Sequence, residues 1–158
     1  MMEDQKGTSF FRFEDLRVYD KSLEYYNWVT TQAKQADDFA KRTLFMPLMD
    51  AATKVSINIA EGSSYNKSQF AVYLKSAKSA VRECVVLTTM AQQNGFFTEE
   101  QYNVSRTLLI EMTKMVGAMI VSLQKPYSKR NNDNTAEPSY EQTDVQDNTS
   151  DFNIDFNY

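Results

Sequence analysis

Apolar residues recur at intervals of three and four through most of the chain, and this helical spacing constrains the fold more than any other feature. Four segments carry the pattern, at about 14–35, 38–61, 66–94 and 98–125. The 158 residues include only 4 Gly and 3 Pro, too few for a turn-rich β-sandwich. Short connections between long helices make successive helices antiparallel. The sequence therefore predicts an all-α, up-down-up-down antiparallel four-helix bundle over residues 13–125.

Each predicted helix has an inward face whose residues share the helical period. Asn66 and Thr98, each followed by Gln three residues later, have the spacing of a capping box. Gly62 is predicted to end the second helix with a positive φ. Pro47 either kinks that helix or begins it, and we favour a kink because the apolar spacing continues on both sides. The inward faces, in chain order, are Leu16, Tyr19, Leu23, Tyr26, Thr30 and Ala33; Leu44, Leu48, Ala51, Ala52, Val55 and Ile59; Phe70, Leu74, Ala77, Val81, Cys84, Leu87 and Ala91; and Tyr102, Leu109, Met112, Val116, Met119 and Leu123.

The chain has no His and a single Cys, Cys84, and these counts exclude several classes of active site. They remove His-based acid–base catalysis, Ser-His and Cys-His nucleophiles, Cys/His zinc sites and an intrachain disulfide. Only Glu61, Glu83 and Glu111 are carboxylates near inward positions, too few for a carboxylate metal centre. We therefore predict no catalytic residue, no metal, no cofactor and a reducing, cytoplasmic location. Cys84 is predicted to be a small buried apolar residue.

Acidic charge is concentrated in residues 126–158. This segment holds two basic and seven acidic residues, a net charge of −5, and the overall charge of −4 leaves +1 for residues 1–125. It is polar and has no helical period, so we predict an acidic disordered tail, and a flexible N-terminus over residues 1–12. In the last eight residues apolar positions alternate with polar ones, which fits a peptide that docks on a protein partner, or a tail with a few apolar residues. The apolar positions are Phe152, Ile154, Phe156 and Tyr158.

We expect neither a leader peptide nor a membrane-spanning segment. Residues 1–7 are polar, and no apolar stretch follows them. The most apolar stretch near the end of the predicted bundle, at 116–123, is far shorter than the roughly 20 residues that a spanning helix needs. The expectation is a protein without a membrane partner.

One pattern resembles a known family. Its parts are Phe13-Glu14-Asp15-Leu16, Ala51-Ala52, Asn58-Ile59-Ala60-Glu61-Gly62, Phe70, Leu74, Ala77 and Glu83. Over about residues 10–125 this pattern is similar to the bacterial four-helix-bundle proteins named for the intervening sequence of 23S rRNA genes. The resemblance implies a subunit of a ring-like homopentamer with no enzymatic activity, and an association with nucleic acid or ribosomes. Related bundles serve as accessory factors to reverse transcriptases and hold nucleic acid on a basic pentamer.

The polar residues of that pattern have a functional and a structural interpretation. Asn58 and Glu61 could line a lumen or hold a ligand. Alternatively, Glu61 accepts hydrogen bonds from the start of the third helix, and Asn58 pairs with the backbone or with a neighbouring subunit. We favour the structural interpretation. It assigns Asn58, Glu61, Gly62 and Glu83 to local structure or to an oligomer interface.

Basic residues on the third predicted helix are the candidate contacts for RNA or DNA. Lys75, Lys78 and Arg82 share one helix face, and Lys67 lies near the helix start. Repeated around a ring, such a stripe would attract phosphates, and the acidic tail could compete with nucleic acid for it. A solvated helix face is the alternative. No aromatic residues interleave with these positions, so we do not expect sequence-specific reading of single strands.

Aromatic residues exceed what one bundle core can bury, which favours self-association. The residues concerned are Tyr25, Tyr26, Trp28, Tyr65, Tyr73, Phe96 and Phe97. From sequence, the leading hypothesis is a non-catalytic homo-oligomeric scaffold, pentameric by the family resemblance, whose tail recruits a protein partner or keeps the ring soluble. The alternative hypothesis is an accessory factor that binds RNA or DNA through the basic face.

Overall fold

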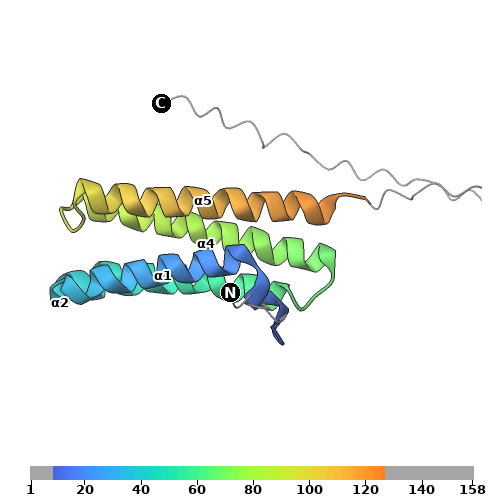
Figure 1. Ribbon diagram of the computed structural model, residues 1–158. Helices are drawn as coiled ribbons and strands as arrows, with labels where there is room; N and C mark the ends of the chain where they lie inside the picture. The colour runs from blue at the N-terminus through green and yellow to red at the C-terminus, as the bar shows by residue number, and fades with distance from the viewer. Residues whose placement is uncertain (1–8, 127–158) are drawn as a thin grey trace, which may run out of the picture. The chain divides into compact units, whose positions relative to one another are not determined.

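The computed structural model describes residues 9–126, which form an all-α helical bundle, as predicted (Figure 1). The predictions for residues 1–8 and for the tail, including Phe152, Ile154, Phe156 and Tyr158, lie outside the described residues. The elements are η1 (Arg12–Asp15), α1 (Arg17–Gln35), α2 (Asp38–Ala40), η2 (Lys41–Phe45), α3 (Met46–Gly62), α4 (Lys67–Gln93) and α5 (Glu99–Gln124).

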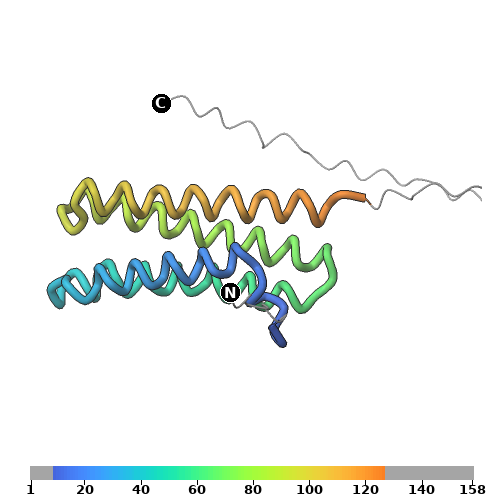
Figure 2. The backbone as a smooth tube through the Cα atoms, in the orientation of Figure 1, coloured from blue at the N-terminus to red at the C-terminus, as the bar shows by residue number. Residues whose placement is uncertain are grey.

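The long helices are neighbours in the order α1, α3, α4, α5 around the bundle. α3 packs along α4, α4 along α5, and α1 closes the bundle against both α3 and α5. The backbone reverses direction at each connection, so successive long helices are antiparallel (Figure 2). The apolar core therefore lies between all four, and α1 and α4 occupy opposite corners.

Local side-chain chemistry sets the ends of α4 and α5. The Asn66 side chain accepts a hydrogen bond from the Gln69 backbone N–H at 3.0 Å. Thr98 and Gln101 form the complete capping box, with bonds of 3.1 and 2.9 Å. At the α4–α5 turn Gly95 has a φ of +74°, and Phe96 N–H donates to the Ala91 carbonyl at 2.9 Å. This is the Schellman arrangement that glycine favours at a helix end.

The second predicted helix is helical on both sides of Pro47, and a π-helical turn ends just before it. The kink that we favoured stays a prediction. η2 is π-helical, and Pro47 follows it in the first turn of α3. Proline has no N–H to donate to the carbonyl four residues earlier, so a regular α-helical bond is missing here. The break is therefore a change of helical winding rather than a new start.

The predicted inward face of α1 is wrong by about one residue. Val18, Ser22, Tyr25 and Val29 are the buried residues, whereas Leu23 is 37% exposed. Ser22 Oγ lies 2.8 Å from Ser56 Oγ on α3, and Tyr25 Oη lies 3.0 Å from Ser105 Oγ on α5. These hydroxyls enter the core because each has a hydrogen-bond partner there. A pattern that scores only apolar residues cannot anticipate such pairs.

The inward residues of the later helices agree better with prediction. Leu48, Ala51, Ala52, Val55 and Ile59 of α3 are all buried, as are Leu74, Ala77, Val81, Cys84 and Ala91 of α4. Cys84 is fully enclosed, and burial raises the pKa of its thiol to about 12. The buried cysteine is therefore a protonated core residue at neutral pH.

Within residues 9–126, α5 alone is long and apolar enough, by length and composition, to cross a membrane. A core helix of a soluble protein passes the same test. Here one face of α5 packs into the bundle. Its buried residues are Ser105, Leu109, Met112, Val116 and Ile120. Our expectation considered only the uninterrupted apolar run at 116–123, and the absence of a membrane partner stays a prediction.

Candidate functional site

Gly62 is a point of close contact between α3 and α4 at their shared end. The predicted positive φ is wrong, because among the described residues only Gly95 has one, and Gly62 is the buried last residue of α3. A Cβ at Gly62 would lie 2.5 Å from Tyr73 Cβ and 2.8 Å from Phe70 Cδ2. The residue must therefore be glycine because it lacks a side chain, not because of its backbone angle.

Glu61 and two tyrosines form a polar and aromatic cluster beside Gly62. The Tyr73 hydroxyl donates to Glu61 Oε1 at 3.1 Å. We predicted that Glu61 accepts from the start of the next helix, and its partner is a side chain in the second turn of α4. The Tyr65 and Tyr73 rings stack with centroids 5.3 Å apart and planes 6° from parallel. Hydrogen bonding with Tyr65, desolvation and the bond to Glu61 raise the pKa of Tyr73 to about 12.

Asn58 and Glu83 lie along the α3–α4 seam, away from this cluster. The Asn58 side chain donates to the Lys54 carbonyl at 2.7 Å, one turn earlier in α3. Lys54 Nζ forms an ion pair with Glu83 Oε2 at 2.8 Å, and this bond raises the pKa of Lys54. Because both partners are exposed, the pair contributes little to stability. Of the four residues that we assigned to local structure or an oligomer interface, Glu61 and Gly62 thus meet Tyr73. Asn58 and Glu83 each bond to Lys54.

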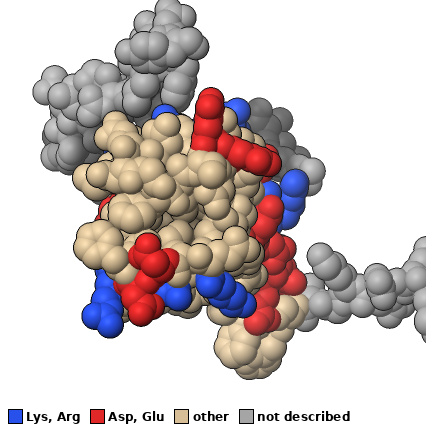
Figure 3. All heavy atoms as spheres, turned by 90° about the vertical axis from the view of Figure 1, so that its left-hand side faces the viewer, with Lys and Arg blue, Asp and Glu red and all other residues tan. Residues whose placement is uncertain are grey.

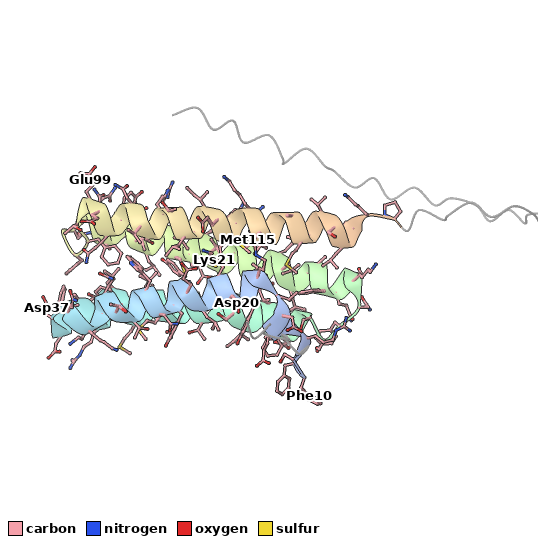
Figure 4. All side chains as sticks on the ribbon, in the orientation of Figure 1. Phe10, Asp20, Lys21, Asp37, Glu99 and Met115 are labelled. Atoms are coloured by element: carbon pink, nitrogen blue, oxygen red, sulfur yellow. The ribbon has the colours of Figure 1, made fainter. Side chains whose placement is uncertain are left out.

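The three carboxylates considered as metal ligands in the sequence are held apart. Glu61 bonds to Tyr73, Glu83 to Lys54, and Glu111 to Lys21 at 2.9 Å. Lys21 bridges Glu111 and Glu24 and extends from α1 toward α5 (Figure 4). Within the described part of the chain no group of three His, Cys, Asp or Glu side chains could hold a metal ion.

The basic residues of α4 lie along one flank of the helix. Lys67, Lys75 and Arg82 are exposed and Lys78 is half-buried. A groove of about 330 Å³ lies between the first turns of α4 and the end of α5. Its lining residues are Lys67, Ser68, Ala71, Val72, Lys75, Leu123 and Gln124. Lys67 and Lys75 therefore line the groove, whereas Lys78 and Arg82 lie further along the same side of α4, outside the groove.

A group of large apolar side chains is exposed near the other end of the bundle. Phe39, Met46, Val86 and Met90 are each more than half exposed, and the rings of Phe39 and Phe96 lie 6.2 Å apart. Phe39 contacts Phe96, and Lys54 contacts Glu83, so residues 39–54 run antiparallel to residues 83–96. Phe39, Met46, Val86, Met90 and Phe96 therefore lie on the same side of the bundle. We call these five residues the apolar face.

The end of the bundle next to the apolar face is also poor in charge. Asp37 and Glu99 mark this end in Figure 4. Viewed from it, uncharged residues occupy the centre of the surface and charged residues lie around the rim (Figure 3). Exposed apolar surface with a polar rim is typical of a protein–protein contact.

Comparisons with known proteins support the resemblance found in the sequence. A sequence model for a family described as 23S rRNA-intervening sequence protein matches residues 14–118. No curated protein matches the chain. A solved structure of a protein of unknown function from the S23 ribosomal protein family of Bacteroides thetaiotaomicron VPI-5482 is similar, with a TM-score of 0.59 and 21% identity. The match covers 66% of this chain and 95% of that one, and at this identity it supports the fold alone.

Proposed function

This chain belongs to the 23S rRNA-intervening sequence protein family, and on that premise we propose that it is a non-catalytic scaffold that works as a homo-oligomer, a homopentamer by analogy with the family. The observation that carries the proposal is the apolar face. Four of its five residues are more than half exposed, and several exposed large apolar side chains on one side of a domain favour an interaction site. The burial of Cys84 and the lack of His support the non-catalytic part.

A ring of identical subunits needs two different surfaces on each subunit, because each copy meets its two neighbours in different ways. The apolar face, on α2, α3 and α4, would supply one of them. On α5 the exposed Ile110 and Val121 share one helix face, and α5 lies diagonally across the bundle from α3. Two apolar surfaces on different sides favour a closed ring over a two-fold dimer.

The experiment is a molar mass measurement by light scattering or sedimentation at micromolar concentration. A pentamer would have a mass of about 91 kDa, five times the chain mass of 18.2 kDa. Met46→Lys and Met90→Lys should shift the mass toward that of the single chain, because each places a charge in the apolar face. Leu23→Lys on α1 is the matched control and should leave the mass unchanged. A wild-type chain that is monomeric at micromolar concentration would refute the scaffold proposal.

We propose a nucleic-acid accessory role as the second candidate. It is supported by the basic flank of α4, where Lys75 and Arg82 are exposed and form no ion pair within residues 9–126. Binding through such contacts should weaken steeply with salt, because each neutralised phosphate releases a counterion. Charge reversal at Lys75, Lys78 and Arg82 together should abolish it. If neither RNA nor DNA binds at low salt, this candidate fails while the scaffold proposal stands.

We place both activities in the cytoplasm, where a reducing environment keeps the single thiol free. Further binding of a protein partner through the C-terminal tail stays a prediction from sequence.

A further inference from the structure

We propose that Tyr65 is a stacking platform for one base of a single-stranded nucleic acid, with Tyr73 as the layer that supports it. The proposal deepens the nucleic-acid candidate and rests on it. From sequence we expected no sequence-specific reading of single strands, because no aromatic residues interleave with the basic positions. Stacking on Tyr65 tolerates every base, so it is compatible with that expectation.

The Tyr65 ring is held in place before any ligand arrives. One of its faces is covered by the Tyr73 ring, parallel to within 6°. Tyr73 is in turn fixed by its hydrogen bond to Glu61 and by close packing of its Cβ against Gly62. Binding a base on a ring that is already ordered loses less conformational entropy than binding on a freely rotating side chain.

The Tyr65 side chain stays accessible to a ligand. The residue is 46% exposed although Tyr73 covers one face. Tyr65 lies in the connection between α3 and α4 rather than within a helix. Stacking on an aromatic ring tolerates every base, because each has a π-face.

Local charge indicates how a strand would lie across the platform. The Glu61 carboxylate near Tyr73 disfavours a phosphate on that side. Lys67 follows Tyr65 by two residues and lines the groove together with Lys75. A strand with its base on Tyr65 would therefore direct its phosphates toward the groove and the basic flank of α4.

The test compares two labelled strands of equal length on the full chain: a thymidine homopolymer and an abasic strand with the same phosphates. Both should show the same salt dependence, and the thymidine strand should bind about ten-fold more tightly because only it can stack. Tyr65→Leu should remove this preference while Tyr65→Phe keeps it. Tyr102→Leu, at the far end of the bundle on α5, is the matched control.

Circular dichroism and molar mass must be unchanged in Tyr65→Leu, so that lost binding is not lost structure. The platform is refuted if the preference for thymidine persists in Tyr65→Leu. It is also refuted if Tyr65→Leu lowers the affinity for both strands by the same factor. The nucleic-acid candidate then survives as long as charge reversal at Lys75, Lys78 and Arg82 still removes binding. If neither strand binds the wild-type chain, the candidate and the platform fall together.

Discussion

Replacing Gly62 by alanine tests the close contact between α3 and α4. The new Cβ would lie 2.5 Å from Tyr73 Cβ, which is 0.9 Å short of the 3.4 Å at which ordinary contact begins. Tyr73 Cβ is bonded to the α4 backbone, so it cannot move away unless α4 shifts. Overpacking of this kind costs about 1–3 kcal/mol, whereas glycine to alanine in a helix interior gains up to about 1 kcal/mol. We expect a net loss of about 1–2 kcal/mol.

Gly117→Ala is the matched control, because no atom lies within 4 Å of a Cβ placed there. This variant should gain about 0.5–1 kcal/mol from helix propensity alone. Denaturant and thermal unfolding, both followed by circular dichroism, measure both variants, at one protein concentration since self-association changes apparent stability. The melting temperature should fall by about 2–8 °C for Gly62→Ala and rise by about 1–4 °C for Gly117→Ala. If both substitutions stabilise equally, the steric account of Gly62 is wrong.

Three further predictions follow from buried and charged groups. The Cys84 thiol, with its pKa raised to about 12 by burial, should react with a thiol reagent only as fast as the bundle opens, so labelling should track unfolding across a denaturant series. The pKa of Tyr73 is raised from 10.0 to about 12, so the folded state favours the neutral phenol. The stability that this shift contributes is complete below pH 10 and is lost as the pH rises to about 12. Tyr73→Phe should therefore lose less stability than the wild-type chain between pH 10 and about pH 12. Deleting residues 126–158 changes the net charge from −4 to +1 and should strengthen nucleic-acid binding at low salt; equal affinities would contradict the electrostatic argument.

Sequence reasoning succeeded where one residue determines a local structure. The Thr98 capping box needs only a hydroxyl and a glutamine three residues apart, and both hydrogen bonds are present. It failed where the outcome depended on a partner far along the chain. The rotation of α1 depends on Ser56 and Ser105, which lie 34 and 80 residues from their partners.

The candidate site shows the same division. The basic flank of α4 could be identified from helical spacing, because all its members lie on one helix. The stack of Tyr65 on Tyr73 could not, because Tyr65 precedes the helix and its position depends on how the α3–α4 turn closes. The need for glycine at position 62 was anticipated for the wrong reason, since a close approach between two helices leaves no local signal.

The two interhelical hydroxyl pairs of α1 also favour one handedness of the bundle. Four helices with the same apolar faces can be arranged clockwise or anticlockwise, and apolar burial alone barely distinguishes these mirror topologies. Ser22 pairs with α3 and Tyr25 pairs with α5. If α3 and α5 exchanged sides, each hydroxyl would face the other helix and lose its interhelical partner. Ser22 would keep its bond to the Tyr19 carbonyl at 2.6 Å, whereas the buried Tyr25 hydroxyl would be left unpaired at a cost of about 1–3 kcal/mol. A few oxygen atoms thus specify on which side of α1 each neighbour lies.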